Sequence, residues 1–200
     1  QPQEETIGSR SIPLAILACV VAVLAIGGGF TAHTVRVRDE QMRADLLRDA
    51  RMIQQAISWR RIQNFSGSEE DIRLADYRRM KEQFIGLRTI LPKCRFIYIL
   101  GQKADGAMFV YIDSEQDGSK DYSPPGQVYS EATHLLQEAF VTGIACFERS
   151  TDRWGTWVTA FMPVKDEQTG RLVAILGIDI SAVQFDRYVA EHRLAAILFV

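Results

Sequence analysis

The most regular pattern along the chain is a pair of apolar runs near its carboxyl end. Residues 154–165 and 172–180 are rich in Trp, Val, Ile, Leu and Phe, and a short polar connection that contains Gly170 separates them. Two such runs joined in this way predict an antiparallel hairpin. The second run has no polar residue before Asp179, which predicts a central strand covered on both faces. Asp179 is therefore an acid at the end of a buried strand, where an unpaired carboxylate is unfavourable.

Three earlier runs predict further strands of the same sheet. Phe96–Leu100 and Ala107–Asp113 flank a turn, and Ile144–Glu148 precedes the hairpin. Alternation along the second of these runs places three side chains on one face, namely Phe109, Tyr111 and Asp113. Strands joined by hairpins and preceded by helices predict an α+β fold with an antiparallel sheet.

A polar helical pattern covers Thr34–Gln63. It carries one narrow apolar stripe at helical spacing, formed by Leu46, Ala50, Ile53 and Ile57. A helix of this kind can pack on a twin, which would make the stripe a dimer seam. It can equally lie on its own domain, and the pattern leaves both interpretations open.

Two further helices and one long loop complete the pattern. Ser68 begins a capping signal for a helix whose apolar positions are Met80, Phe84, Leu87 and Leu91, and Pro92 ends it. Ser130 is expected to cap a shorter helix. The stretch 115–126 is rich in Asp, Ser, Pro and Gly, and its length is typical of a binding loop.

The stretch Ile12–Ala32 has no charged residue and is long enough to cross a bilayer as a helix. A cleaved signal peptide would have a shorter apolar region and a small-residue cleavage site. Residues 194–200 resemble the start of a second span. Because the chain begins at Gln1 and ends in this apolar run, we expect it to be a segment of a longer protein. The arginines after the first span weakly favour a cytoplasmic location for the intervening residues, but long loops translocate largely regardless of charge.

Composition and residue types exclude several other classes. The formal net charge is −2 and no basic stripe stands out, so we expect no nucleic-acid partner. The three histidines lie on different elements without metal-ligand spacing. We find no nucleophile elbow, phosphate loop or zinc motif, and we expect neither a catalytic site nor a cofactor in this segment. Cys94 and Cys146 could pair in an oxidising compartment if their geometry allowed it.

An ordered set of motifs resembles the Cache family, the PAS-like sensor domains held outside the cytoplasmic membrane of bacterial and archaeal receptors. The set comprises FIYIL at 96–100, FVYIDS at 109–114, DYSPPG at 121–126, RWGTWVTAFMPV at 153–164 and GRLVAILGIDI at 170–180. The resemblance implies a five-stranded antiparallel sheet, a ligand pocket between the sheet and its covering loops, and a periplasmic location. It also implies an output domain after Val200, most simply a histidine kinase, with a diguanylate cyclase or a chemoreceptor as alternatives.

The resemblance implies one organisation for the chain and one ligand contact. The expected parts are a cytoplasmic tail at 1–11, a membrane helix at 12–32, a signalling or dimer helix at 33–67, a sensor domain at 68–190 and the start of a second membrane helix at 194–200. Cache domains that bind amino acids carry an Asp near the end of the last strand, which contacts the ligand's amino group, and Asp179 matches it. Their Arg-x-Trp-Tyr cluster, which holds the ligand carboxylate, is missing here, and this places an α-amino acid ligand in doubt.

The candidate ligand-binding residues combine this match with large amphipathic rings near strand ends, which can line a small site and present a polar tip. They are Tyr111, Asp113, Tyr122, Trp154, Trp157 and Asp179. Each ring could instead belong to the core, and each acid could bond to backbone amides. We therefore expect a small-molecule sensing domain in a two-span receptor of the inner membrane, acting as a homodimer. The alternatives are a ligand-free docking module and a cytoplasmic PAS module.

Overall fold

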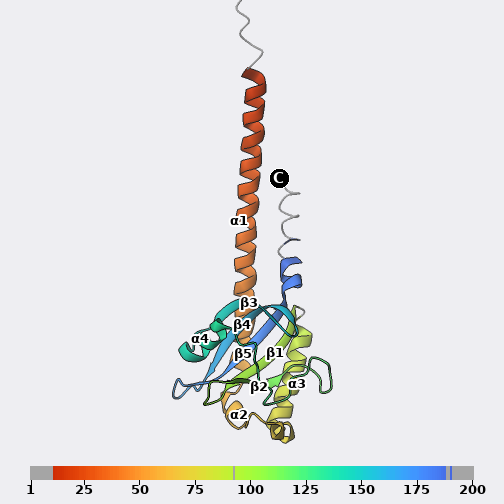
Figure 1. Cartoon of the computed structure of the whole chain (residues 1–200), viewed down its shortest axis with the longest axis vertical. Helices are drawn as coiled ribbons and strands as arrows, with labels where there is room; N and C mark the ends of the chain where they lie inside the picture. Colours follow the sequence, from red (N-terminus) through yellow and green to blue (C-terminus); the bar gives the residue numbers. More distant parts are fainter. Residues whose placement is uncertain (1–10, 92, 188–189, 191–200) are drawn as a thin grey trace, which may run out of the picture. The chain divides into compact units, whose positions relative to one another are not determined.

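The structure is a computed structural model that describes residues 11–91, 93–187 and 190 (Figure 1). It divides into two compact units, one comprising 1–41 with 188–200 and the other 42–187. The described part of the first unit is the amino-terminal portion of helix α1 (Ser11–Ala56). The second unit contains the sheet and all the other helices that the structure describes.

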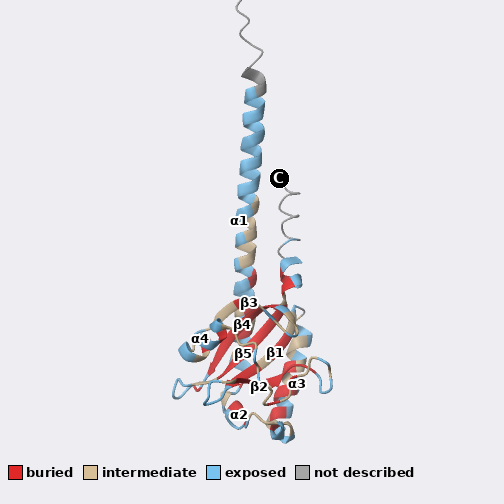
Figure 2. Ribbon diagram, viewed as in Figure 1, coloured by how far each residue is buried: buried red, intermediate tan, exposed pale blue. Residues whose placement is uncertain are grey.

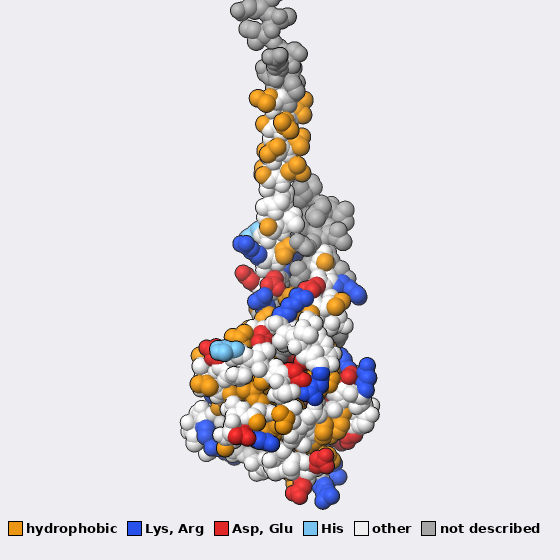
Figure 3. Space-filling view, in the orientation of Figure 1, with side chains coloured by type: hydrophobic (Ala, Val, Ile, Leu, Met, Phe, Trp, Pro, Cys, Tyr) orange, Lys and Arg blue, Asp and Glu red, His pale blue; other side chains and the backbone are white. Residues whose placement is uncertain are grey.

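The amino-terminal portion of α1 has an apolar surface. Hydrophobic side chains from Leu14 to Phe30 are exposed along it, and they cover its outer part in the space-filling view (Figures 2 and 3). By length and composition, α1 is the one helix among the described residues that could cross a membrane. Residues 1–10 of the expected tail at 1–11 and all of the expected second span at 194–200 lie outside the described residues.

The second unit is built on one antiparallel sheet of five strands, as the sequence predicts. Their spatial order is β2-β1-β5-β4-β3. The strands are β1 (Cys94–Gln102), β2 (Met108–Asp113), β3 (Cys146–Asp152), β4 (Gly155–Lys165) and β5 (Leu172–Ser181). β5 is the central strand and is buried along most of its length (Figure 2). The predicted α+β fold and the predicted position of the last strand are both confirmed.

Helices and loops cover the two faces of this sheet. The helical elements of the unit are the end of α1, α2 (Trp59–Gln63), the 3₁₀ helix η1 (Glu69–Arg73), α3 (Ala75–Ile90), α4 (His134–Thr142) and the helical turns of 182–187. α4 packs over one face, which we call the front, around a core cluster of Leu100, Met108, Val110, Leu136, Ala139, Phe161 and Ile175. The segment 126–129 hydrogen-bonds along the outer edge of β2, through Val110 N to Gln127 O at 2.9 Å and Tyr129 N to Met108 O at 2.9 Å.

The apolar stripe on α1 packs on its own domain. Leu46, Ala50, Ile53 and Ile57 are each at most 7% exposed within the chain. Met42 and Leu46 line the same hollow as Ile178 and Ile180 of β5, on the back face of the sheet. The stripe is therefore buried within its own domain, as the intramolecular interpretation expects, and the dimer helix stays a prediction.

Three local predictions are wrong. The helix expected to run to Gln63 ends at Ala56, because Ser58 has an extended conformation and a new short helix, α2, begins after it. The short helix α4 is capped by Thr133, whose hydroxyl accepts from Leu136 N at 3.2 Å. Ser130 instead contacts Glu131 and Arg153. Ser68, which was expected to cap α3, instead precedes η1, and α3 begins only at Ala75.

A β-bulge changes the faces that alternation predicts for β2. Ile99 pairs with Ile112, but the next residue, Leu100, pairs with Val110, so Tyr111 is an extra residue in its strand. Such a bulge places two consecutive side chains on the same side of the sheet. Tyr111 therefore stays with Phe109, with ring centroids 4.6 Å apart, on the back face. Asp113 turns to the front face, so the prediction that it shares a face with Tyr111 is wrong.

The two cysteines that could have formed a disulfide are free thiols. Cys94 begins β1 and Cys146 begins β3. Strands β5 and β4 lie between β1 and β3 in the sheet. Neighbouring strands lie about 4.8 Å apart, so three strand spacings exceed the reach of a disulfide.

Candidate functional site

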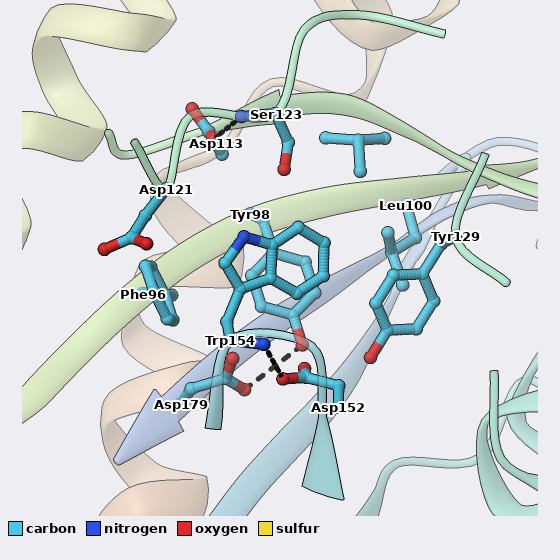
Figure 4. A pocket seen from close by; sticks show the side chains of 11 residues that line it. Phe96, Tyr98, Leu100, Asp113, Asp121, Ser123, Tyr129, Asp152, Trp154 and Asp179 are labelled. Atoms are coloured by element: carbon cyan, nitrogen blue, oxygen red, sulfur yellow. Dashed lines mark hydrogen bonds between the residues drawn. The ribbon is translucent and has the colours of Figure 1, made fainter. Parts of the chain in front are cut away.

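A cavity lies on the front face of the sheet, beneath the loop that connects β2 to α4. It is a half-open hollow with an empty volume of about 410 Å³, part of which is open solvent. Eleven residues from β1, β2, β5, the covering loop and the β3–β4 turn line it (Figure 4). They are Phe96, Tyr98, Leu100, Val110, Asp113, Asp121, Ser123, Tyr129, Asp152, Trp154 and Asp179. The cavity therefore combines aromatic rings with four carboxyl groups.

Asp179 lies at the base of this cavity and is only 3% exposed. Its Oδ1 accepts a hydrogen bond from Thr159 Oγ1 at 2.7 Å and another from the Tyr98 hydroxyl at 3.1 Å (Figure 4). Burial raises the pKa of Asp179 to about 7, the two hydroxyl donors oppose that rise, and the carboxylates of Asp152 and Glu148 add to it. Among the described residues, no Lys, Arg or His forms an ion pair with Asp179. At neutral pH this site thus holds a buried acid poised between its two protonation states.

Tyr98 reaches Asp179 because the neighbouring strand has no side chain beneath its ring. Tyr98 on β1 pairs with Gly177 on β5, and a Cβ at Gly177 would overlap the Tyr98 ring. The glycine lets the ring lie flat on the sheet, with its hydroxyl directed along β5 toward the acid. Burial, followed by the nearby Asp179 charge, raises the pKa of Tyr98 well above its usual value, so the phenol remains a proton donor.

Replacing this glycine tests the arrangement. We expect Gly177→Ala to lower the free energy of unfolding by about 1–3 kcal/mol, because the added methyl group displaces the Tyr98 ring and weakens its bond to Asp179. Gly86→Ala is the matched control, since Gly86 lies in helix α3 with nothing within 4 Å of the added Cβ. The control is expected to gain up to about 1 kcal/mol from better helix propensity. Urea unfolding measures the free energy of unfolding of both variants. Equal changes in the two would contradict the close contact between Gly177 and the Tyr98 ring.

Asp152 is fixed at the cavity wall by the turn between β3 and β4. Its Oδ1 accepts from the backbone N–H of Trp154 at 2.8 Å and of Gly155 at 3.0 Å, and from Trp157 Nε1 at 2.9 Å. Trp157 itself packs edge-on against Phe96, with ring centroids 5.0 Å apart. The same turn carries the Trp154 ring into the cavity (Figure 4). These bonds set the position of the acid and of the ring together.

Asp113 fastens the start of the covering loop to the domain. Its Oδ1 accepts from Lys81 Nζ of α3 at 2.5 Å and from Glu115 N at 3.2 Å, and its Oδ2 accepts from Ser123 N at 2.7 Å. Lys81 and Asp113 are both buried. Burial raises the pKa of Asp113, and the Lys81 cation opposes that rise. Both oxygens of this carboxylate are therefore engaged in holding the loop.

A second ion-pair cluster fastens the middle of the same loop. Arg95 at the start of β1 donates to Asp121 Oδ2 at 2.6 Å and also contacts Glu115, which Arg88 of α3 contacts as well. Burial acts to raise the pKa of Glu115, but hydrogen bonds from Arg95 and Ser119 outweigh it and hold the pKa below its usual value. The loop is thus tied at two points to the sheet and to α3.

Three of the six residues predicted from the sequence line the cavity, namely Asp113, Trp154 and Asp179. The other three lie elsewhere. Tyr111 packs on Phe109 at the back face, and Trp157 supports Asp152 from within the core. Tyr122 lies outside the cavity lining, with Lys81 Nζ 4.4 Å from its ring centroid. Ligand binding by each of these six residues stays a prediction.

Sequence reasoning missed most of the lining, and the missed residues share no local motif. Phe96, Tyr98 and Leu100 alternate along β1, and they could have been found by asking which face of β1 adjoins Asp179. At Asp152 the sequence indicated only a turn, and not a cavity-lining acid. Within the described part of the chain, no group of three or more His, Cys, Asp and Glu side chains could hold a metal ion.

No protein-family model matches the chain, and no curated protein matches it significantly. Solved structures do match. The ligand-binding domain of the Campylobacter jejuni chemoreceptor Tlp3 in complex with L-valine aligns with a TM-score of 0.56 at 14% identity, over 86% of this chain and 66% of that one. The isoleucine-bound sensory domain of Tlp3 aligns with a TM-score of 0.55 at 14% identity, over 86% and 65%.

A further structure of the Tlp3 sensory domain aligns with a TM-score of 0.52 at 13% identity, over 83% of this chain and 64% of that one. The chain therefore spans just under two thirds of the length of these domains. At this level of identity the match concerns the fold. The long leading helix, the five-stranded antiparallel sheet and these neighbours agree with one another. The chain therefore shares the fold of the Tlp3 sensory domain.

Proposed function

We propose that this chain is the small-molecule sensing domain of a membrane receptor. The domain of residues 42–187 would lie on the extracytoplasmic side of the inner membrane, and the apolar part of α1 would anchor it there. The fold of receptor sensory domains and the exposed apolar surface from Leu14 to Phe30 support this proposal. A histidine kinase output domain beyond Val200 is part of the proposal, with a diguanylate cyclase or a chemoreceptor as alternatives.

The observation that carries the proposal is the buried Asp179 at the base of a solvent-connected cavity. A buried carboxyl group without a cationic partner is unfavourable, and proteins otherwise retain few such groups. A ligand that contacts this acid would remove the unfavourable desolvation. A ligand-free docking module has no such reason to keep both the cavity and the acid.

A route from ligand to output follows from the chain order. Asp179 lies near the end of β5, and the helical turns of 182–187 begin directly after Ser181. Ala182 and Phe185 are buried, and Arg149 of β3 forms a two-bond ion pair with Asp186. A ligand that shifts the end of β5 would shift this helix. It can do so only by the difference between its affinities for the two arrangements.

A ligand screen tests the function. The chain in detergent micelles would be screened by thermal unfolding against small metabolites, and at least one is expected to raise the midpoint, since a ligand at 100 times its Kd adds about 2.7 kcal/mol. Asp179→Ala is expected to abolish the shift, whereas Glu167→Gln, in the exposed hairpin turn, is the matched control. The absence of any stabilising compound for the wild type would refute the proposal.

The side of the membrane is tested separately. Gly118 lies in an exposed turn of the covering loop, so a reporter inserted there should leave the sheet intact. Activity of a periplasm-specific reporter is expected, and activity of a cytoplasm-specific reporter would favour the cytoplasmic PAS alternative. The homodimer remains a prediction, and it would need a surface other than the buried stripe of α1.

A further inference from the structure

We infer that the cavity binds a small organic cation that carries no carboxylate group, such as an alkylamine or a quaternary ammonium compound. The inference rests on the proposed sensing function and specifies its ligand. It draws on the charges around the cavity, on the free oxygens of two acids, and on the aromatic lining.

The charges come first. Four carboxyl groups line the cavity, and none of the described lining residues is a Lys, Arg or His. Lys81 neutralises Asp113, and Arg95 neutralises Asp121. Asp152 and Asp179 have no ion-pair partner within the part of the chain that the structure describes. Two of the four acids therefore have no cation within ion-pair distance among the described residues.

The same two acids present oxygens that the protein does not use. All the hydrogen bonds that Asp179 and Asp152 accept from described residues reach Oδ1. Oδ2 of each is left to a donor within the cavity. Asp179 is 97% buried, so a cationic donor would meet it out of contact with bulk water, where a charge-assisted hydrogen bond is strong.

Aromatic rings form much of the remaining lining. Phe96, Tyr98, Tyr129 and Trp154 surround the space above the two acids (Figure 4). The rings of Tyr129 and Trp154 are nearly parallel, at 11°, with centroids 6.4 Å apart. Ring faces attract a cation within about 6 Å, and more strongly when water is excluded. Arg95 already lies 4.1 Å from the Phe96 ring centroid and Arg153 lies 4.8 Å from the Trp154 ring centroid, so cations do pack on rings of this lining. The rings together with the two unpaired acids thus suit an ammonium group that has an apolar body.

An amino acid fits this site poorly. Its carboxylate would enter a cavity that already has four carboxyl groups and no basic lining residue. The guanidinium groups that contact the covering loop are already engaged by its acids, Arg95 by Asp121 and Glu115 and Arg153 by Glu131. The solved Tlp3 domains hold L-valine and isoleucine. We therefore infer a different ligand class for the same fold.

Two matched pairs of probes test the inference. Isobutylamine differs from L-valine only by the α-carboxylate, and choline differs from glycine betaine mainly by a carboxylate. Binding to the full chain in detergent micelles would be followed by Trp fluorescence and by thermal shift. At least one cation is expected to bind about tenfold or more tightly than its carboxylate-bearing partner, since each charged contact changes affinity by such factors. Isobutanol, which is neutral, is expected not to bind.

Variants complete the test. Asp179→Asn and Asp152→Asn keep a side-chain oxygen for the existing donors, and each is expected to weaken cation binding by about tenfold or more. Glu167→Gln is expected to leave it unchanged. Valine or betaine binding as tightly as its partner would overturn the ligand class and leave the sensing function standing. If neither these probes nor any screened metabolite binds, both the ligand class and the proposed function are wrong.

Discussion

The Asp113→Ala variant is expected to lose about 3–5 kcal/mol of the free energy of unfolding, because it leaves a buried lysine without a counter-charge. Lys81 is 7% exposed and its Nζ lies 2.5 Å from Asp113 Oδ1. The substitution also removes the acceptor for the backbone N–H groups of Ser123 and Glu115. Urea unfolding in detergent, followed by Trp fluorescence, measures the loss.

Two further variants separate the causes of this loss. Asp117 lies 3.8 Å from Lys81 but is 70% exposed, so Asp117→Ala should change stability by less than about 1 kcal/mol. The double variant Lys81→Met with Asp113→Ala removes the stranded cation and should recover part of the loss. A double variant as unstable as the single one would assign the loss to the backbone donors. A loss below about 1 kcal/mol for Asp113→Ala itself would contradict the role of the pair.

The sheet could be predicted from the sequence because its strands carry strong local signals. The run from Leu172 to Ile180 has no polar residue before Asp179, and only a strand covered on both faces suits such a run. The glycine-containing connection predicts the hairpin, and β4 and β5 do pair in the structure, with Val158 opposite Ile180. Apolar periodicity of this kind is a property of the local sequence, so a strand predicted from it does not depend on how distant residues pack.

The site could not be predicted to the same extent, because its geometry depends on pairings between distant residues. Asp113 faces the cavity only because Tyr111 bulges out of register, and nothing in the alternation of β2 signals that extra residue. Tyr98 reaches Asp179 only because Gly177 lies opposite it. Asp179 itself was found, since a lone acid in an apolar run stands out in the sequence.

The cavity also shows why large rings were a weak guide. Trp154 lines it, but Trp157, three residues further along the chain, instead packs on Phe96 and donates to Asp152. Both rings are amphipathic, and their sequence context is nearly the same. The tight turn at 152–155 directs one ring into the cavity and the other into the core. Turn geometry, which composition does not report, decides between the two roles.

The acid at the base of the cavity, Asp179, should make stability fall as pH rises, which is the opposite of the usual effect of a carboxyl group. Asp179→Asn is expected to become more stable relative to the wild type as pH rises from 4 to 8. The pKa of Asp179 is raised from 3.8 to about 7 by burial, with Asp152 and Glu148 adding to the rise. Stability from a raised pKa is fully present below the unfolded value, near 3.8, and is lost as pH rises through the folded value.

The asparagine cannot ionise, so it escapes this loss. At about 1.4 kcal/mol per pKa unit, the difference in unfolding free energy between variant and wild type should grow by about 3 kcal/mol across that range. Any constant effect of the substitution cancels in the comparison. Urea unfolding at pH 4, 6 and 8 measures it. A difference that stays flat with pH would mean that the acid is not desolvated, and the case for a ligand at its free oxygen would fail with it.

Asp186→Asn is the matched control, because the Arg149 ion pair lowers the pKa of Asp186. Stability from a lowered pKa is present above the unfolded value and is lost as pH falls through the folded one. For Asp186 that change lies between its lowered pKa and 3.8, so the stability of the control relative to the wild type should stay nearly constant from pH 4 to 8. A pH-dependent difference for Asp179→Asn beside a nearly constant one for Asp186→Asn would show that ionised Asp179 lowers the stability of the domain above neutral pH. A ligand cation that pairs with this acid would then restore that stability, which couples binding to the end of β5.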